Sequence, residues 1–331
     1  MVDVLYSLVD VNERFDRLVI DPLYIRHLDM TIKSSFDRIC SVDNKVLSRI
    51  CEKILPRIYD QVNKLIVEPH AMKQVFTINY PQLYSLSLIG FQEEELFQYL
   101  TDDSVLRYLL TEQITDLNID IQVDTIIDFS QSLSNKFELI LSLSKRLISL
   151  NFCQLFGYRT LPLWFPTPPS KSCMSLTLTK LIIRVTIFRD CLYLLDGRFD
   201  CLSTLIIHVE NISLTPSCEY NTEKLPKLKY FSLISYTDTF YYDQLIIPLL
   251  RRMINLEELI LYLLVIRYDS TYIDGIVLYD EILCYMPQLN KLTFNINTDV
   301  RNNNIRIDRS SNEDVQRSFI GRGYGQSSTC I

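Results

Sequence analysis

The sequence predicts an α/β fold, and within that class a solenoid whose parallel strands line a concave face while helices lie outside. Three observations lead to this prediction. A hydrophobic-x-x-Leu-x-hydrophobic pattern recurs ten times between residues 25 and 298, stretches with helical spacing separate many recurrences, and similar proline-containing junctions precede three of them. A repeat of roughly 20 to 40 residues is typical of solenoids, whose units each pack only against their neighbours.

Each recurrence of the pattern is expected to form a short strand. The positions between its apolar residues are mostly polar, which gives the alternation expected of a strand with one buried face, because successive side chains of a strand point to opposite faces. The central position is Leu in nine of the ten recurrences. In chain order the recurrences are Ile25-Leu28-Met30, Val62-Leu65-Val67, Leu83-Leu86-Leu88, Ile114-Leu117-Ile119, Leu147-Leu150-Phe152, Leu178-Leu181-Ile183, Leu202-Leu205-Ile207, Leu228-Phe231-Leu233, Leu256-Leu259-Leu261 and Leu289-Leu292-Phe294.

Proline marks the start of three of these strands. The junctions are Tyr80-Pro81-Gln82-Leu83, Leu225-Pro226-Lys227-Leu228 and Met286-Pro287-Gln288-Leu289. Proline ends a helix and favours extended geometry in the residue before it, so each junction is expected to end one helix and begin the next strand.

Two of the expected helices, over residues 242–253 and 279–286, are near copies of each other. Each has an aspartate, Asp243 or Asp280, near its expected N-terminal end, where a carboxylate can cap the helix or oppose its dipole. Their apolar positions have helical spacing, which suits packing against a layer of strands.

From Ile25 to Asn297 the chain resembles the leucine-rich-repeat family and its L-x-x-L-x-L-x-x-N pattern. The resemblance implies a solenoid of about ten units over residues 25–298. The chain departs from the family at the ninth position, where an Asn or Cys satisfies the turn after the strand. Only Asn297 agrees there, so the turns are expected to close differently and the curvature to be irregular. The other nine residues are Lys33, His70, Phe91, Gln122, Leu155, Thr186, Glu210, Tyr236 and Leu264. The alternative is an ordinary α/β domain with Leu-rich strands.

Residues 1–24 do not fit the repeat and are expected to form a helix, because their apolar residues have helical spacing. The segment resembles the second half of an F-box. The positions that match the family's pattern are Asp3-Val4-Leu5, Val11-Asn12, Phe15 and Asp21-Pro22. This resemblance implies contact with the adaptor subunit of an SCF-type cullin ubiquitin ligase. The residues expected to bind the adaptor or pack the domain are Leu5, Leu8, Val9 and Phe15.

The first half of the F-box pattern, L-P-x-E-x-L-x-x-I-F-x-x-L, does not occur in the sequence. In the family this half also holds the adaptor, so two expectations stand: a gene product that begins upstream, or a receptor that has lost its ligase connection. The alternative for residues 1–24 is a helix that caps the open end of the solenoid, which every solenoid needs.

The composition argues against nucleic-acid and membrane partners. The formal net charge is −7 without a dense Lys/Arg stripe, whereas a phosphate backbone requires concentrated positive charge. The most apolar run, Leu259–Ile266, is far shorter than the about 20 residues that span a bilayer. Nine scattered cysteines without a C-x-x-C pair indicate reduced thiols, which favours a cytoplasmic or nuclear location.

No residue pattern points to an enzyme, a cofactor or a metal. The three histidines lie far apart in the sequence, and no nucleotide-binding loop or nucleophile motif occurs. Asp116, Asp120 and Asp124 alternate along one segment, an arrangement that is more typical of a solvated strand edge than of a metal site. The chain is therefore expected to be a binding protein without catalytic activity.

The leading functional hypothesis is a protein-binding substrate receptor similar to the F-box/leucine-rich-repeat subunits of SCF-type ubiquitin ligases. The alternative is a stand-alone leucine-rich-repeat interaction scaffold with no ligase contact. The polar tail, residues 299–331, is expected to leave the solenoid and to be disordered.

The target protein, whose identity the sequence does not reveal, is expected on the concave face of the carboxy-terminal half. Residues beside the central Leu point away from the core; they are mostly polar in the early repeats but include apolar and aromatic side chains in the later ones. An exposed sheet avoids such side chains unless a partner covers them. The expected target-binding residues are Ile182, Arg184, Ile206, His208, Tyr230, Ile234, Glu258, Ile260 and Tyr262. The alternative is that a loop or the tail covers this surface.

Overall fold

The computed structural model describes residues 25–33, 39–102, 104–122, 131–152, 162–167, 174–215, 222–268 and 272–301, together with Ser7, Asn12, Arg14, Arg17 and Asp21. The chain divides into two compact units. The first comprises residues 1–128 and 135–161, and the second comprises residues 129–134 and 162–331. Both have an α/β architecture built on parallel strands.

The described part of the first unit has five parallel strands that follow one another in chain order. They are β1 (His27–Asp29), β4 (Lys64–Val67), β5 (Ser85–Gln92), β6 (Asp116–Gln122) and β7 (Ser149–Phe152). Each strand pairs with the next, and the central leucines of the sequence pattern are aligned across the ladder as Leu28, Leu65, Leu86, Leu117 and Leu150. A short antiparallel pair, β2 (Ile32–Lys33) and β3 (Ile39–Cys40), follows β1.

Helices connect most of the strands of the first unit. They are α4 (Asn44–Arg49), η1 (Ile50–Ile54), α5 (Leu55–Ile58), α6 (Pro69–Val75), α7 (Glu93–Thr101), α8 (Val105–Glu112) and, from residue 135 on, α9 (Gln131–Leu143). Side chains cap several of them. The carboxylate of Glu68, for example, accepts the backbone N–H groups of His70 at 2.8 Å and Ala71 at 2.9 Å, and Pro69 occupies the first position of α6. Helices α4, α6 and α8 therefore begin where a side chain satisfies their first N–H groups.

The second unit repeats the arrangement with longer strands. In its described residues these are β8 (Lys180–Ile187), β9 (Thr204–Asn211), β10 (Tyr230–Thr239), β11 (Glu258–Tyr268) and β12 (Lys291–Arg301), again parallel and in chain order. The central positions of the sequence pattern are again aligned, as Leu181, Leu205, Phe231, Leu259 and Leu292. Strand β12 continues through Arg301, so the first residues of the expected tail extend the sheet; residues 302–331 lie outside the described part of the chain.

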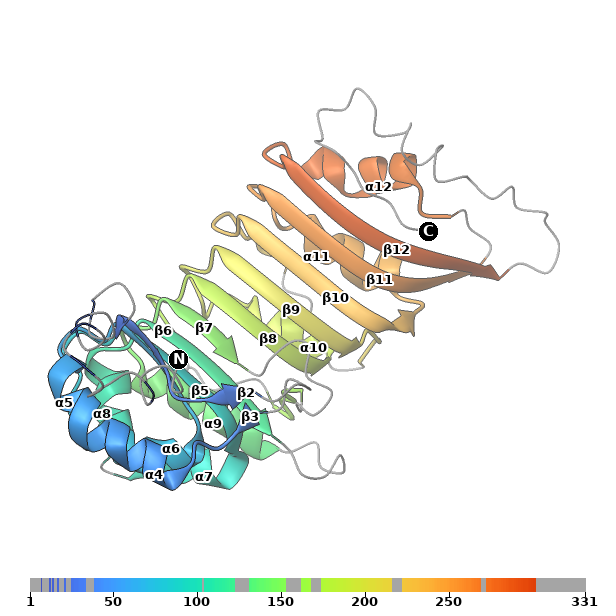
Figure 1. Cartoon of the computed structure of the whole chain (residues 1–331). Coiled ribbons are helices and arrows are strands. Elements are labelled where there is room, and N and C mark those ends of the chain that lie inside the picture. Colours follow the sequence, from blue (N-terminus) through green and yellow to red (C-terminus); the bar gives the residue numbers. More distant parts are fainter. Residues whose placement is uncertain are drawn as a thin grey trace. The chain divides into compact units, whose positions relative to one another are not determined.

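The helices of the second unit lie on one face of its strands (Figure 1). They are α10 (Phe188–Leu194), η3 (Tyr242–Ile246), α11 (Ile247–Leu250), α12 (Gly275–Glu281) and the 3-10 helix η4 (Leu283–Tyr285). The helix expected over residues 279–286 instead begins at Gly275, because the Asp274 carboxylate accepts the N–H groups of Ile276 and Val277. Asp280 therefore lies in the last turn of α12, and the prediction that it caps the N-terminus is wrong.

One backbone contact recurs along both units. In eight of the ten patterns, the residue after the first apolar position offers its carbonyl to two consecutive N–H groups of the following repeat. Ser203 accepts from Lys229 at 2.8 Å and from Tyr230 at 3.0 Å; Lys229 in turn accepts from Glu257 at 2.8 Å and from Glu258 at 3.0 Å. The other acceptors are Arg26, Asn63, Tyr84, Thr115, Thr179 and Glu257. This contact fixes the register with which each new strand joins the sheet.

The cores of the two units are built from the repeated pattern. Every apolar position of the ten recurrences is buried, and each recurrence carries a strand, so the predicted strand positions are confirmed. Each proline junction is a turn that leads into the next strand: the Leu228 N–H donates to the Leu225 carbonyl at 3.3 Å, and the Leu289 N–H donates to the Met286 carbonyl at 3.1 Å. Among the described residues a helix ends directly before only the third junction, where η4 ends at Tyr285.

Candidate functional site

The outward face of β8 to β11, opposite the helices, carries all nine of the expected target-binding residues. Along each strand the motif leucines and their apolar partners point toward the helices, so the residues between them point outward. The parallel register then brings neighbours together across the strands: Ile182 lies beside Ile206, Arg184 beside His208, and Ile234 beside Tyr262. The nine residues form one contiguous surface, here called the outward face. They are Ile182, Arg184, Ile206, His208, Tyr230, Ile234, Glu258, Ile260 and Tyr262.

Most residues of the outward face are half-buried, but two are less accessible than the alternation predicts. The His208 side chain is 6% exposed, because the ring of Tyr236 packs edge-on against it with ring centroids 5.2 Å apart. Ile234 is also buried. A partner on this face would therefore meet Tyr236 before His208.

Charged groups border the outward face at the amino ends of its strands. The Lys291 ammonium lies 2.6 Å from the Glu258 carboxylate, and Tyr230 lies beside Glu258 in the register. Burial raises the pKa of the Tyr230 hydroxyl, and the negative charge of Glu258 raises it further. The hydroxyl is therefore a neutral hydrogen-bonding group for a partner at physiological pH.

Arg184 has a partner on its own sheet. Its guanidinium lies 2.7 Å from the Glu210 carboxylate, and both side chains are partly exposed. A partly exposed pair of this kind adds little to stability, because solvent screens the attraction. The pair instead presents an ordered, nearly neutral polar group at the border of the apolar surface.

Exposed aromatic residues near the carboxyl ends of β10 and β11 were not part of the prediction. Tyr236 and Tyr268 are 61% and 58% exposed, and Tyr268 stacks on Phe240 with ring centroids 5.6 Å apart. The six-residue pattern covers only the first part of each strand, whereas β11 runs on to Tyr268. Continuing the alternation from Tyr262 in steps of two residues would have reached Tyr268.

The first unit presents a polar outward face. Asn118 of β6 lies beside Asn151 of β7, and the side-chain oxygen of each is buried without a hydrogen-bond partner among the described residues. Asp120 is nearly buried, and this burial raises the pKa of its carboxyl. Of the alternating aspartates, Asp116 is half-buried on the same strand and Asp124 lies outside the described residues. Ile66 of β4 is an apolar outward residue of this unit, but the other positions of its row are the polar residues Asp29, Ser87, Asn118 and Asn151.

The residues expected to contact a ubiquitin-ligase adaptor are Leu5, Leu8, Val9 and Phe15, and all four lie outside the described residues. Their role stays a prediction from the sequence. Within the part of the chain that the structure describes, no group of three or more His, Cys, Asp or Glu side chains could hold a metal ion.

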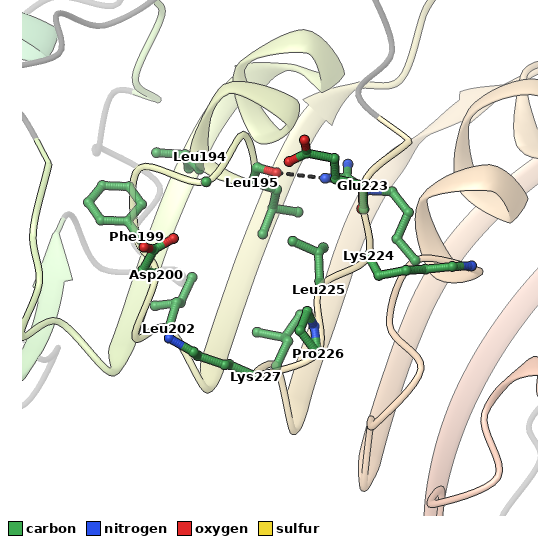
Figure 2. Close-up of a pocket in the computed structure, with 13 residues that line it drawn as sticks. Leu194, Leu195, Phe199, Asp200, Leu202, Glu223, Lys224, Leu225, Pro226 and Lys227 are labelled. Carbon is green, nitrogen blue, oxygen red and sulfur yellow. Dashed lines mark hydrogen bonds between the residues drawn. The ribbon is translucent and has the colours of Figure 1, made fainter.

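A hollow of about 210 Å³ lies between the turns that precede β9 and β10 (Figure 2). Figure 2 shows Leu195, Leu202 and Leu225 around it. Arg252, only 5% exposed, contributes to its lining and donates to the carbonyls of Glu223 at 2.8 Å and Leu195 at 2.7 Å. Because these bonds connect three successive turns, we interpret the hollow as a packing feature held by Arg252 rather than as an active site.

Comparison of the sequence with protein-family models and with curated proteins gives no match. Among the described residues, no helix has both the length and the apolar character needed to cross a bilayer.

Proposed function

We propose that this chain is a leucine-rich-repeat-like solenoid that binds a partner protein through the outward face of β8–β11. The observation that carries this proposal is the contrast between the outward faces of the two units. Both use the same strand register, but the first unit has one isoleucine, Ile66, in the outward row that also holds Asp29, Ser87, Asn118 and Asn151. The second unit has three isoleucines in the corresponding row, Ile182, Ile206 and Ile260, and adds Tyr230 and Tyr262, where a solvated sheet would carry polar residues. Tyrosine is also frequent among the residues that dominate binding energy at protein interfaces.

The solenoid interpretation is supported by the recurring contact between successive repeats. In eight repeats the equivalent carbonyl accepts the two equivalent N–H groups of the next repeat, among them Arg26 at the first and Glu257 at the ninth. An ordinary α/β domain has no reason to repeat one contact at the same position of its sequence pattern, whereas stacked units do.

The proposed function predicts that Tyr230→Ala and Tyr262→Ala each weaken capture of the partner by about 1–3 kcal/mol. Each substitution removes an aromatic ring from the outward face without opening the buried core, so the midpoint of thermal unfolding should change little. Binding is measured with a photo-reactive amino acid at position 260, followed by mass spectrometry of the crosslinked partner. Tyr108→Ala is the control, because Tyr108 is an exposed tyrosine on helix α8 of the first unit. Unchanged crosslinking by both tyrosine variants would place the binding site elsewhere.

A second candidate function, an SCF-type substrate receptor, is favoured by the F-box-like spacing of residues 3–22. If it holds, the full chain should co-purify with the ligase adaptor, and the combined Leu5→Asp and Leu8→Asp change should abolish that association by placing charges in an apolar contact. Ile66→Lys is the control, because it adds a charge far along the sequence. Absence of the adaptor from the unaltered chain, or its retention by the double variant, would leave the scaffold function alone.

A further inference from the structure

We infer that the partner presents an amphipathic α-helix, which lies across strands β8 to β11 on the outward face. This inference rests on the proposed function and specifies the kind of surface that the partner must carry. Four features support it: the apolar side chains cross the strands, the strand backbone beneath them is already hydrogen-bonded, the strand spacing matches a helix, and one border is positively charged.

The apolar side chains of the outward face form a stripe that crosses the strands instead of following one of them. Ile182 of β8 lies beside Ile206 of β9, and Ile234 of β10 lies beside Tyr262 of β11. Ile260 of β11 continues the row of Ile182 and Ile206, because Ser232 of β10 lies beside both Ile206 and Ile260. The stripe therefore offers apolar side chains on β8, β9 and β11, and β10 fills the space between them with the buried side chains of Ser232 and Ile234.

The backbone beneath the stripe has no hydrogen-bonding capacity left for a partner. Strands β9 and β10 are paired on both sides, so their N–H and C=O groups are used within the sheet. An extended segment laid across this face would bury its own backbone groups without partners, at a cost of about 1–3 kcal/mol for each. A helix satisfies its backbone internally and brings only side chains to the contact.

The spacing of the stripe also fits a helix. Neighbouring strands are about 4.8 Å apart, so a ligand that crosses them must offer an apolar group at about that interval. Residues three and four apart in a helix are separated by about 4.5 and 6.0 Å along its axis and lie on one side. Residues on the same side of an extended chain are about 6.7 Å apart, which exceeds the strand spacing, so they would no longer lie over the apolar side chains after about three strands.

One border of the stripe carries a net positive charge. The outward row at the amino ends of the strands begins with Lys180 on β8 and ends with Lys291 on β12, and Glu258 of β11 is the acidic residue between them. At the opposite border, Arg184 and Glu210 neutralise each other. The helix should therefore carry acidic residues on the flank that faces Lys180 and uncharged polar residues on the other flank.

The test uses two displayed libraries selected against the full chain. In one library the exposed face of a helix in a small three-helix bundle is randomised, and in the other linear peptides are randomised. Binders are then measured against the unaltered chain, against Ile206→Lys and against Ile66→Lys. Ile66 is the matched control, because it is a half-buried outward residue at the same pattern position in β4 of the first unit. Tyr262→Ala serves as the second variant if Ile206→Lys lowers the unfolding midpoint.

We expect the helical library to yield binders that are enriched in acidic residues on one flank. Ile206→Lys should weaken their affinity about 10- to 100-fold, and Ile66→Lys should leave their affinity unchanged. Equal or tighter binders from the linear library, lost in the same variant, would overturn the helix and leave the proposed function standing. If neither library yields a binder that responds to Ile206→Lys or Tyr262→Ala, the outward face is not a binding surface and both proposals fail.

Discussion

Asp190 is the most unusual ionisable residue in the described part of the second unit. It is fully buried near the start of α10, where its carboxylate accepts the Ile187 N–H at 3.4 Å. Burial raises its pKa from 3.8 to about 7, and the backbone N–H groups of Ile187 and Phe165 and the charge of Arg189 only partly oppose that change. Asp190 therefore keeps its proton in the folded state at a pH where the unfolded chain has lost it.

This difference predicts that stability falls as the pH rises from about 4 to about 7. Over that window the unfolded chain releases a proton from Asp190 that the folded chain retains, so folding becomes less favourable by up to about 4 kcal/mol. The loss is complete above about pH 7, where both states are ionised. Asp190→Asn should remove it, because the amide oxygen still accepts the Ile187 N–H without a charge to bury. Urea denaturation of both proteins across the window gives the comparison. A stability difference between them that stays constant with pH would show that Asp190 is not the titrating group.

At the scale of elements, strands were easier to predict than helices. The pattern around Leu205 or Leu259 predicts a strand because buried positions alternate with a period of two from the central Leu onward, and this alternation does not depend on the turns. Helix starts depend on one capping side chain, and two aspartates near Tyr279 compete for that role. Asp280 lies in the copied part of the sequence, but it is Asp274 that reaches the free N–H groups of α12. Similar sequences therefore begin their helices at different points.

The position of the cap predicts unequal effects of two neighbouring substitutions. Asp274→Ala should lower the free energy of unfolding by about 1 kcal/mol, because it removes the acceptor for the Ile276 and Val277 N–H groups. Asp280→Ala should change it by only a few tenths of a kcal/mol, because Asp280 is an exposed residue in the last turn. Equilibrium denaturation measures both, and equal losses would contradict the assignment of Asp274 as the cap.

At the scale of the whole molecule, the sequence located the outward face but not its accessibility. Alternation around each central Leu placed Ile182, Ile206 and Tyr262 on that face, since alternation depends only on strand geometry. It did not reveal that Tyr236 covers His208, because that contact joins residues on neighbouring strands. It also missed the full length of β10 and β11, whose last residues lie beyond the repeated pattern. The two-residue alternation of a strand predicts which face of the sheet a side chain lies on, whereas contacts with neighbouring strands determine how much of that side chain is exposed.

The repeating register leads to a final prediction about how the second unit tolerates deletion. Removing residues 229–256 joins Leu228 directly to Glu257, so Glu257 and Glu258 take the places of Lys229 and Tyr230 against the Ser203 carbonyl. The apolar positions of β11 then replace those of β10, and a shortened but cooperatively folded protein is expected, because stacked units contact only their neighbours. The slope of its unfolding free energy against urea concentration should fall, because less surface becomes exposed on unfolding.

Removing residues 229–241 alone deletes strand β10 but keeps the helices that packed on it, so their apolar faces lose their partner. Circular dichroism with urea denaturation should show a sharp transition for the first deletion and a broad or absent one for the second. If the whole-repeat deletion unfolds while the strand-only deletion folds, the units are not interchangeable repeats, and the solenoid proposal is wrong.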